Sequence, residues 1–338
     1  MLQPSFLVLD KPVGLTSHDC VDVVRRVIGD RRVGHTGTLD PFASGVLLIA
    51  LGPATRLISF LEDDLKVYLC AVRLGISTVT GDPEGEEAER APVPPLEAAQ
   101  VQAVLREMEG EQPQRAHLYS AVKVKGRRLY DYARAGEAVE APVRTIRVDA
   151  AELVSLDGDL LQMRLVCGRG TYARTFAEDL AKRLGTVGHL IGLRRAQSGG
   201  ATLQQAVDMR RLAELVAEAP PADLGGGAVG EEGWRAVLRS ARGTPRLPWR
   251  SPEARWPDIA PLLLSPTEVM PQLAILDLDD REAQRLLRSG LLPTPDPRRE
   301  RPIGDGARFW VRHAGQILAL GEQLDGMRRA LRVMPPEG

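Results

Sequence analysis

The residues best suited to chemistry gather in one short segment, RRVGHTGTLDPFASGVLLIALG (31–52). Gly34, Gly37 and Gly45 let the backbone turn sharply or approach a ligand closely. Asp40 precedes Pro41, which holds the aspartate in an extended or turn conformation. The segment therefore presents a single carboxylate on a tight loop in front of an apolar run. An isolated Asp-Pro pair usually makes only a turn, so this observation alone does not establish catalysis.

A second segment, CGRGTYART (167–175), places Arg174 in the first turn of a predicted helix. A cation there opposes the helix dipole and costs about 0.3–1 kcal/mol. The placement fits an arginine that pairs with a carboxylate or a phosphate. It fits equally well an exposed arginine whose cost solvent screens, and the residues alone do not separate the two.

A third segment, QRAHLYSAVKVKGRRLYDYARAG (114–136), holds six cations against one acid, with three tyrosines among them. Basic side chains interleaved with aromatic rings suit RNA phosphates and stacked bases. The alternative is a solvated basic hairpin over ordinary core tyrosines. The formal net charge of the chain is only −1, so this local imbalance favours RNA. The candidates for contact with the RNA backbone are Lys123, Lys125, Arg127 and Arg128.

Several other kinds of site are excluded by sequence. The chain lacks the glycine patterns of dinucleotide and P-loop sites, the HExxH zinc motif and the GxSxG nucleophile elbow. The five histidines lack metal-ligand spacing, and the three cysteines lie too far apart for a CxxC-type site. We therefore expect an enzyme that uses neither metal nor cofactor.

The length and composition of the chain indicate what kind of protein carries these segments. The chain has 338 residues, with 43% hydrophobic and 26% charged, which is ordinary for a globular protein of about two domains. It shows no signal peptide and no apolar run of the roughly 20 residues that a membrane span needs. Isolated cysteines suit a reducing cytoplasm, so we expect a cytoplasmic protein without a membrane. The absence of a long exposed apolar seam favours a monomer.

The predicted elements that position these segments mix strands and helices. Strands are expected at 6–10, 46–52, 66–75 and 160–167, and helices at 17–29 with Ser17 as N-cap, 96–110 and 171–185. A hairpin at 307–324 and a strand at 330–334 follow. The elements do not alternate regularly, which predicts an α+β fold. The predicted organisation is a catalytic domain at 1–218, a linker or insertion at 219–269 and a small β-rich domain at 270–338.

In this order, the segments resemble the TruB family of tRNA pseudouridine synthases. The matching stretches are DKPVGLTS (10–17), VGHTGTLDPFASGVL (33–47), KVYLCAVRLG (66–75), LYSAVKVKGRRLYDYARAGE (118–137), CGRGTYARTFAEDLAKRLG (167–185) and HLIGLRR (189–195). They cover roughly the first 210 residues, and the HTGTLDP box is highly specific. The resemblance implies a mixed, mainly antiparallel sheet flanked by helices. The tail resembles more weakly the family's PUA-type RNA-binding domain.

The resemblance implies that uridine 55 in the T loop of tRNA is flipped out and isomerised to pseudouridine. Asp40 matches the catalytic aspartate, which attacks the nucleoside or takes a ribose proton; the sequence does not choose. Arg174 matches its arginine partner, which answers why a cation begins the helix. Tyr68 matches the tyrosine that packs on the target base and whose hydroxyl helps remove the C5 proton.

The resemblance also implies a substrate pocket and partners. Tyr172 and Leu193 match pocket residues, although Leu193 fits core packing equally well, and His35 matches a residue that fills the space the flipped base leaves. Lys11 fits better as a support for the neighbouring loop. The implied partner is the T arm of tRNA, with the acceptor stem on the C-terminal domain and no obligatory protein partner. One departure stands out: His117, like Arg115, lies where a small or apolar residue is expected, which predicts an altered cleft wall.

Three other functions remain to be weighed. A guide-RNA-dependent enzyme of the same superfamily would need protein partners. An RNA-binding module or tRNA chaperone would not need Asp40, Tyr68 and Arg174 together, although a chaperone role is compatible with catalysis. A metal-free hydrolase that uses Asp40 lacks an evident second carboxylate in the sequence, and the basic segment counts against it.

Overall fold

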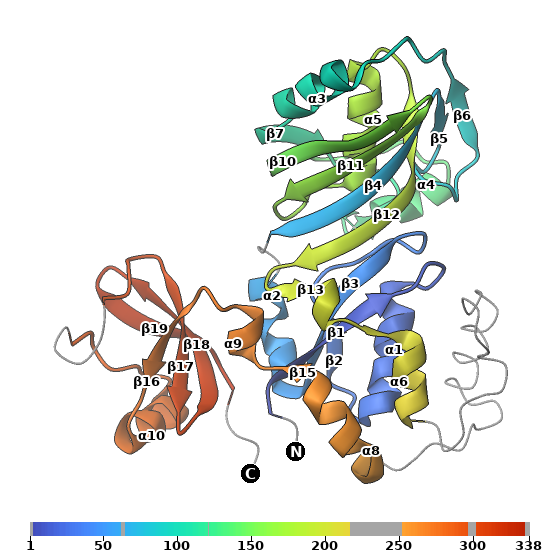
Figure 1. The fold of residues 1–338 in the computed structure, drawn as a ribbon. Coiled ribbons are helices and arrows are strands. Elements are labelled where there is room, and N and C mark those ends of the chain that lie inside the picture. The colour runs from blue at the N-terminus through green and yellow to red at the C-terminus, as the bar shows by residue number, and fades with distance from the viewer. Residues whose placement is uncertain (1–2, 62–64, 121, 217–251, 297–301, 335–338) are drawn as a thin grey trace.

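The computed structural model describes residues 3–61, 65–120, 122–216, 252–296 and 302–334. A large mixed sheet with helices packed against it forms the first part, and a separate four-stranded sheet forms the second (Figure 1). The α+β class predicted from the sequence is confirmed.

The large sheet carries the functional segments. Its main path runs in the order β14 (Val207–Asp208), β1 (Ser5–Lys11), β3 (Ser44–Leu51), β12 (Gly188–Ser198), β4 (Lys66–Leu74), β11 (Leu160–Cys167), β10 (Val143–Asp157) and β7 (Gly110–Arg115). Three short strands pair with this path: β2 (Val33–His35), β13 (Ala201–Thr202) and β15 (Leu263–Leu264). The pairings of β1 with β14 and of β3 with β12 are parallel, and the others are antiparallel. The sheet is therefore mixed and mainly antiparallel, as expected.

Helices cover this sheet, and α1 (Ser17–Ile28) and α5 (Ala173–Arg183) bury their apolar faces in its core. The helices of the first part are α1 (Ser17–Ile28), α2 (Ile58–Leu61), α3 (Ala98–Glu107), α4 (Leu129–Arg134), α5 (Ala173–Arg183), α6 (Met209–Val216), α8 (Pro252–Ile259) and α9 (Pro266–Val269), with 3₁₀ turns η1 (Gly52–Leu57), η2 (Leu203–Gln205) and η4 (Ala260–Leu262). In Figure 1, α3 and α5 lie together over one end of the sheet, and α1 and α6 lie together at the other. Apolar side chains recur at helical spacing in α1 and α5 and fill one continuous core.

The start of α1 corrects one sequence prediction. The N-cap is Thr16, not Ser17, because Thr16 and Asp19 exchange side-chain and backbone hydrogen bonds in a capping box. The Ser17 hydroxyl instead bonds the backbone of Leu39 on both sides, accepting from its N–H at 2.8 Å and donating to its carbonyl at 3.1 Å. Ser17 thus ties the helix to the loop that carries Asp40.

Strand β12 joins the two ends of the large sheet, because it pairs with β4 on one side and β3 on the other. Its Arg195 lies against Gly45, whose φ of +103° is in the region that favours glycine. A Cβ atom at Gly45 would lie 2.2 Å from the carbonyl oxygen of Arg195. The glycine therefore lets β3 begin in contact with β12, immediately after the Asp40 loop.

Two small hairpins project from this framework. One is formed by β5 (Ile76–Thr78) and β6 (Glu87–Arg90), and the other by β8 (Lys123–Val124) and β9 (Arg127–Arg128). The second hairpin turns at Lys125 and Gly126, which both have positive φ, as a two-residue type I′ turn requires.

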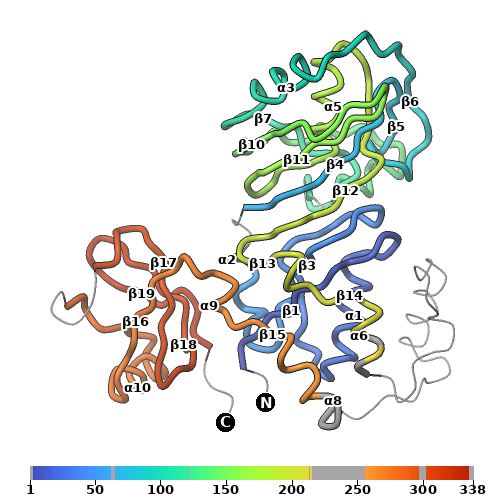
Figure 2. The backbone as a smooth tube through the Cα atoms, in the orientation of Figure 1, coloured from blue at the N-terminus to red at the C-terminus, as the bar shows by residue number. Residues whose placement is uncertain are grey.

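The range predicted as a linker or insertion, 219–269, needs a correction at its end. Its larger part lies outside the described residues. Residues 252–269 form α8, η4, β15 and α9, and β15 pairs with β1. Ile259 and Val269 are fully buried, so this stretch belongs to the fold of the first part rather than to a linker. Figure 2 shows the chain passing beside β1 here before it enters the second sheet.

The second sheet lies in the order β16 (Ala274–Asp277), β17 (Arg308–His313), β18 (Gln316–Leu324) and β19 (Met327–Val333), with α10 (Asp280–Ser289) beside it. The predicted hairpin and closing strand are β17, β18 and β19. Trp310 is buried in an apolar cluster that also contains Phe6 and Val8 of β1. Its indole N–H donates to the Met270 carbonyl at 3.3 Å. The two sheets are thus joined by a shared core.

Candidate active site

The loop at residues 36–43 holds Asp40, and a buried lysine anchors it. The ammonium of Lys11, which is fully buried, donates to the carbonyl oxygens of Pro12, Pro41 and Ala43 at 2.8, 3.2 and 2.7 Å. Burial lowers the pKa of Lys11 to about 8. The interpretation of Lys11 as a support for the loop is confirmed, because its three protons are directed at backbone carbonyls.

Arg195 holds the same loop from the sheet side. Its guanidinium, almost completely buried, donates to the Val46 carbonyl at 2.7 Å and to the Gly37 carbonyl at 3.1 Å. Sequence reasoning did not single out this residue, although it lies within the HLIGLRR stretch. Its signal was an arginine two residues after Leu193, on the strand face that apolar side chains occupy. A buried cation in a strand needs acceptors, and here the loop carbonyls supply them.

Arg174 and Asp40 form a two-pronged ion pair. Arg174 Nε lies 3.1 Å from Asp40 Oδ2, and Nη2 donates to Asp40 Oδ1 at 3.1 Å. This fork geometry is the strong form of an arginine–carboxylate contact. The side chain of Arg174 is 6% exposed and that of Asp40 is 33% exposed, so the carboxylate keeps access to a substrate. Of the two interpretations left open for Arg174, the structure supports the one with a carboxylate partner.

Asp82 is a second carboxylate at Arg174, and sequence reasoning missed it. Its Oδ2 lies 3.3 Å from Arg174 Nη1, and the carbonyl of Thr80 accepts from the same nitrogen at 2.9 Å. Asp82 also accepts from the Thr80 hydroxyl at 2.5 Å and from the Glu84 N–H at 3.1 Å. The available signal was the turn TGDPEG (80–85), in which Thr80 and Asp82 have the spacing of a side-chain-bonded turn.

The electrostatics of this group favour a reactive carboxylate. Burial raises the pKa of Asp40, the Arg174 guanidinium opposes that rise, and the nearby Asp82 adds to it. Burial also raises the pKa of Glu84, with Asp82 and Asp40 adding to the effect. Partial burial therefore makes the Asp40 carboxylate more basic than a fully solvated aspartate, while the Arg174 guanidinium favours its ionised form.

Tyr68, Leu193 and Arg195 share one face of the sheet. Tyr68 on β4 is paired with Arg195 on β12, and Leu193 is paired with Cys70, so the side chains of Tyr68 and Leu193 are diagonal neighbours. Both side chains are 8% exposed. Burial raises the pKa of the Tyr68 hydroxyl, and the Arg195 guanidinium opposes this rise. Arg195 thus connects Tyr68 to the backbone of the Asp40 loop.

His35 immediately precedes the loop that carries Asp40, and Tyr172 lies two residues before Arg174. His35 ends β2, and burial followed by the charge of Arg195 lowers the pKa of its imidazole. Tyr172 is the N-cap of α5, and its backbone N–H donates to the Gln114 side chain at 2.8 Å. Tyr172 therefore begins the helix that presents Arg174.

The four basic residues predicted to touch RNA do not behave alike. Lys123, Lys125 and Arg128 are exposed on the hairpin of β8 and β9. Arg127 is used internally: it binds both oxygens of Glu137 at 2.8 and 2.7 Å and lies over the ring of Tyr132 at 4.5 Å. The hairpin thus offers three exposed cations, and Arg127 stabilises its base.

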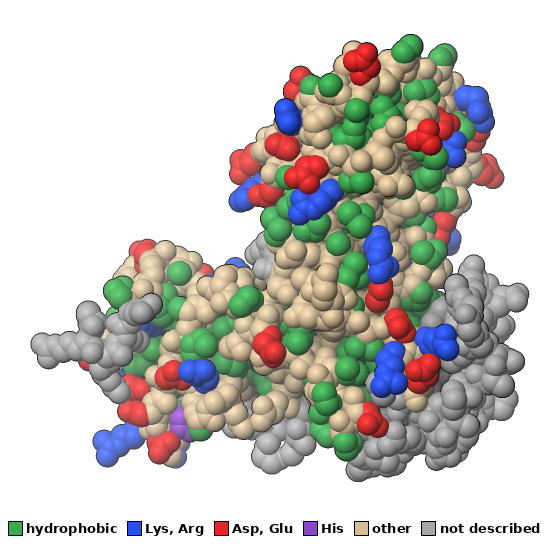
Figure 3. Space-filling model, in the orientation of Figure 1, with side chains coloured by type: hydrophobic (Ala, Val, Ile, Leu, Met, Phe, Trp, Pro, Cys, Tyr) green, Lys and Arg blue, Asp and Glu red, His purple; other side chains and the backbone are tan. Residues whose placement is uncertain are grey.

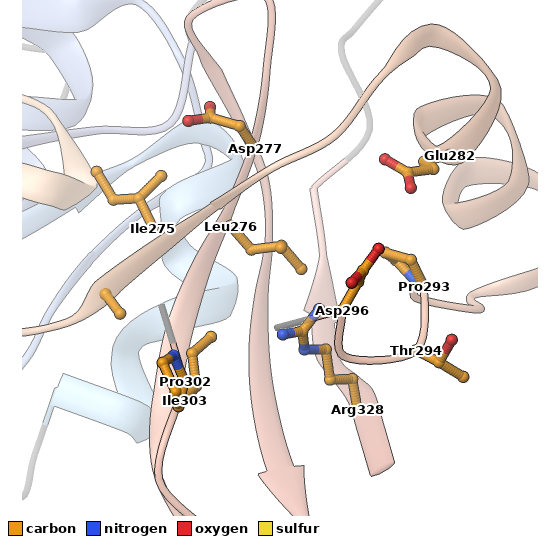
Figure 4. A pocket seen from close by; sticks show the side chains of 11 residues that line it. Ile275, Leu276, Asp277, Glu282, Pro293, Thr294, Asp296, Pro302, Ile303 and Arg328 are labelled. Atoms are coloured by element: carbon orange, nitrogen blue, oxygen red, sulfur yellow. The ribbon is translucent and has the colours of Figure 1, made fainter. Parts of the chain in front are cut away.

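A cavity of about 520 Å³ lies in the second domain, between β16 and β19 (Figure 4). Its lining includes Asp277, Glu282 and Asp296 against Arg328. Among the described residues that line it, three are acidic and one is basic, a balance that does not favour phosphate. On the face shown in Figure 3, cations and anions of the described residues are interspersed, without an extended patch of one sign.

Comparisons with known proteins agree with this geometry. The family described as "TruB family pseudouridylate synthase (N terminal domain)" matches residues 25–173. The tRNA pseudouridine synthase B of Bacillus licheniformis is 46% identical over 219 residues, which cover 63% of this chain and 71% of that protein. The enzyme of the same name from Thermobifida fusca is 45% identical over 218 residues, covering 61% and 73%.

A solved structure extends the likeness to the whole fold. A chain of the Cbf5-Nop10-Gar1 complex superposes with a TM-score of 0.65 at 21% identity, covering 98% of this chain and 85% of that one. At this sequence identity, the superposition establishes only that the two folds are alike. The sequence relatives identify the family: this chain belongs to the TruB family of pseudouridylate synthases.

Proposed function

We propose that this enzyme isomerises uridine 55 in the T loop of tRNA to pseudouridine, with Asp40 as its catalytic carboxylate. The enzyme acts as a tRNA pseudouridine synthase, as its relatives do by name. The observation that carries the residue assignment is the Asp40–Arg174 pair. It is a partly exposed carboxylate held by a buried guanidinium on a loop fixed by Lys11 and Arg195.

The reaction rearranges one nucleoside without net addition of atoms. The N1–C1′ bond breaks, the uracil turns while bound, C5 joins C1′, and the proton on C5 leaves while N1 gains one. Asp40 either attacks the nucleoside or removes a ribose proton, and both roles require its ionised form. Flipping the base out costs a few kcal/mol, less in a loop than in a duplex. Tyr68, packed on the flipped base, is placed to help with the C5 proton.

The remaining assignments concern binding. We propose that Tyr172 and Leu193 line the base pocket and that His35 fills the space the base leaves. The exposed cations Lys123, Lys125 and Arg128 would contact the backbone of the T arm.

At the level of whole domains, we propose that residues 270–338 form a PUA-like domain that binds the acceptor stem. The protein would work as a cytoplasmic monomer without an obligatory protein partner. The two sheets share an apolar core, which would hold the T-arm contact and the acceptor-stem contact at a fixed spacing.

The test is tritium release from C5-labelled uridine in an unmodified tRNA transcript, with purified protein and no guide RNA. A transcript with cytidine at position 55 is the control. We expect release from the first transcript only. No release despite tight tRNA binding would refute guide-independent catalysis and favour a chaperone or guide-dependent protein.

A matched variant tests the catalytic residue. Asp40→Asn keeps the shape of the side chain and removes its charge, so we expect it to bind tRNA without turnover. Appreciable turnover by Asp40→Asn would contradict the role of Asp40, even if the wild-type protein modifies uridine 55.

A further inference from the structure

His117 contacts Arg174 at the nitrogen that Asp40 does not use. The imidazole Nδ1 lies 3.3 Å from Arg174 Nη1, whereas Nε and Nη2 face Asp40. The ring is buried, with 8% exposure. The resemblance described above implies a small or apolar residue at this position. His117 is therefore a buried polar ring in direct contact with the arginine that holds Asp40.

The hydrogen bonds around the ring fix which nitrogen carries its proton. Nδ1 accepts from the backbone N–H of Tyr119 at 3.1 Å and faces Arg174 Nη1. An amide N–H and a guanidinium are donors only, so Nδ1 must be the acceptor for both. The proton of the neutral ring is therefore on Nε2, which lies 3.7 Å from Glu178 Oε1.

The donors of Arg174 show what this acceptor does. Its partners beyond Asp40 are the carbonyls of Thr80 and Tyr119, the Asp82 carboxylate and His117 Nδ1. Three of these four compete for the two protons of Nη1. Engaging this nitrogen fixes the rotation of the planar guanidinium, and that rotation determines whether the opposite edge meets both oxygens of Asp40.

The ring itself has little freedom to move. A Cβ atom on Gly81 would lie 3.1 Å from His117 Nε2 and 2.5 Å from Glu178 Oε1, so the turn packs directly on this pair. On the other side, the Gln114 side chain bonds both the N–H and the carbonyl of Tyr172, at 2.8 and 3.2 Å. The segment that carries His117 is thus attached to the start of α5.

We propose that His117 is a positioning residue, whose Nδ1 accepts from Arg174 and so fixes the guanidinium edge that holds Asp40. The inference rests on the proposed function of Asp40. The charged groups near the ring are Arg174 and Glu178 on α5 and Asp40, and Asp82 is reached through Arg174. A second proton on the ring would direct N–H at two donors and place a cation beside the guanidinium. The role therefore belongs to the acceptor nitrogen and not to a charge.

Two substitutions at this position separate an acceptor from a mere space-filling ring. In His117→Asn, the amide oxygen can occupy the place of Nδ1, whereas His117→Leu supplies volume without an acceptor. The measurement is the single-turnover rate of pseudouridine formation at saturating enzyme, together with tRNA affinity. We expect the Leu variant to lose about 10- to 100-fold in rate with unchanged tRNA affinity. The Asn variant should recover to within about threefold of the wild-type rate.

A control variant accounts for the general cost of losing a buried histidine. His189 is 7% exposed, bonds the Ile76 carbonyl at 2.7 Å and is not among the hydrogen-bond partners of Arg174. His189→Leu should lower the melting temperature without lowering the rate. The proposal is overturned if His117→Leu keeps the wild-type rate, if Asn and Leu are equally impaired, or if His189→Leu loses as much activity.

A measurement that needs no turnover keeps this proposal separable from the proposed function. Long-range ¹H–¹⁵N correlation spectra of the free protein report the tautomer of His117 directly. We expect the proton on Nε2, and a proton on Nδ1 would refute the inference whether or not the enzyme modifies tRNA. A wild-type protein without activity but with the expected tautomer would refute the proposed function and, with it, the catalytic consequence drawn for His117.

Discussion

Replacing Arg174 with lysine tests the active-site geometry most directly, because the charge remains while the fork is lost. The guanidinium makes six contacts: two with Asp40 and one each with Asp82, Thr80, Tyr119 and His117. The guanidinium offers five protons and an ammonium group only three, so at least two of these acceptors lose their donor.

The rate effect follows from the position of Asp40. A misplacement of about 1 Å at a reacting group costs about 10²-fold in rate, which corresponds to about 2.7 kcal/mol in the barrier. We expect Arg174→Lys to lose about this much in single-turnover rate. Each buried acceptor left unpaired costs roughly 1–3 kcal/mol of folding free energy, so the melting temperature should fall as well.

The assay pairs this variant with a matched control. Arg194 also holds a carboxylate with a fork, since its two terminal nitrogens contact the two oxygens of Asp10 at 3.1 and 2.7 Å. That pair is 40% and 26% exposed, and exposed pairs contribute only about 0–1 kcal/mol. Arg194→Lys should keep the wild-type rate and stability. A wild-type rate in Arg174→Lys would refute the argument that the fork positions Asp40.

Three further outcomes are expected. Because burial raises the pKa of Asp40 and activity needs its ionised form, the rate should fall on acidification at a pH above the ordinary aspartate value of about 3.9; a rate that stays flat down to that pH would contradict this. Neutralising Lys123, Lys125 and Arg128 together should weaken tRNA binding and reduce the slope of log affinity against log salt by up to about three charges, and an unchanged slope would exclude them from the interface. Thr16→Ala should cost about 1 kcal/mol of unfolding free energy through the lost cap, as measured by denaturant titration; no loss would return the cap to Ser17.

Local patterns predicted much of the fold. The apolar alternation of β4 and β11 and the helical spacing of α5 were sufficient, because each buries one face against a single core. The boundary near 270 was harder to place. Residues 252–269 are rich in proline and poor in periodic apolar residues, yet β15 completes the edge of β1 through backbone hydrogen bonds that side-chain pattern does not show.

Some residues of the active site could likewise be named from the sequence, and others could not. Asp40 and Arg174 lie in dense motifs and could be named from sequence, whereas Asp82 and His117 acquire their meaning only when three distant segments meet at one guanidinium. Arg127 shows the converse limit. It belongs to the basic run, but Glu137, ten residues away, engages it in a pair that a count of charges does not reveal.

The order in which Arg174 and its partners leave the ribosome has a consequence for biosynthesis. Asp40 precedes Arg174 by 134 residues, Thr80 by 94 and His117 by 57. During translation, the two carboxylates and the loop that carries Asp40 are therefore made well before the cation that holds them. Closing contacts over such spans costs chain entropy that local structure does not repay. The nascent chain can build α1 and the antiparallel pair of β2 and β3 early, but its catalytic centre must be assembled late, once α5 has been synthesised.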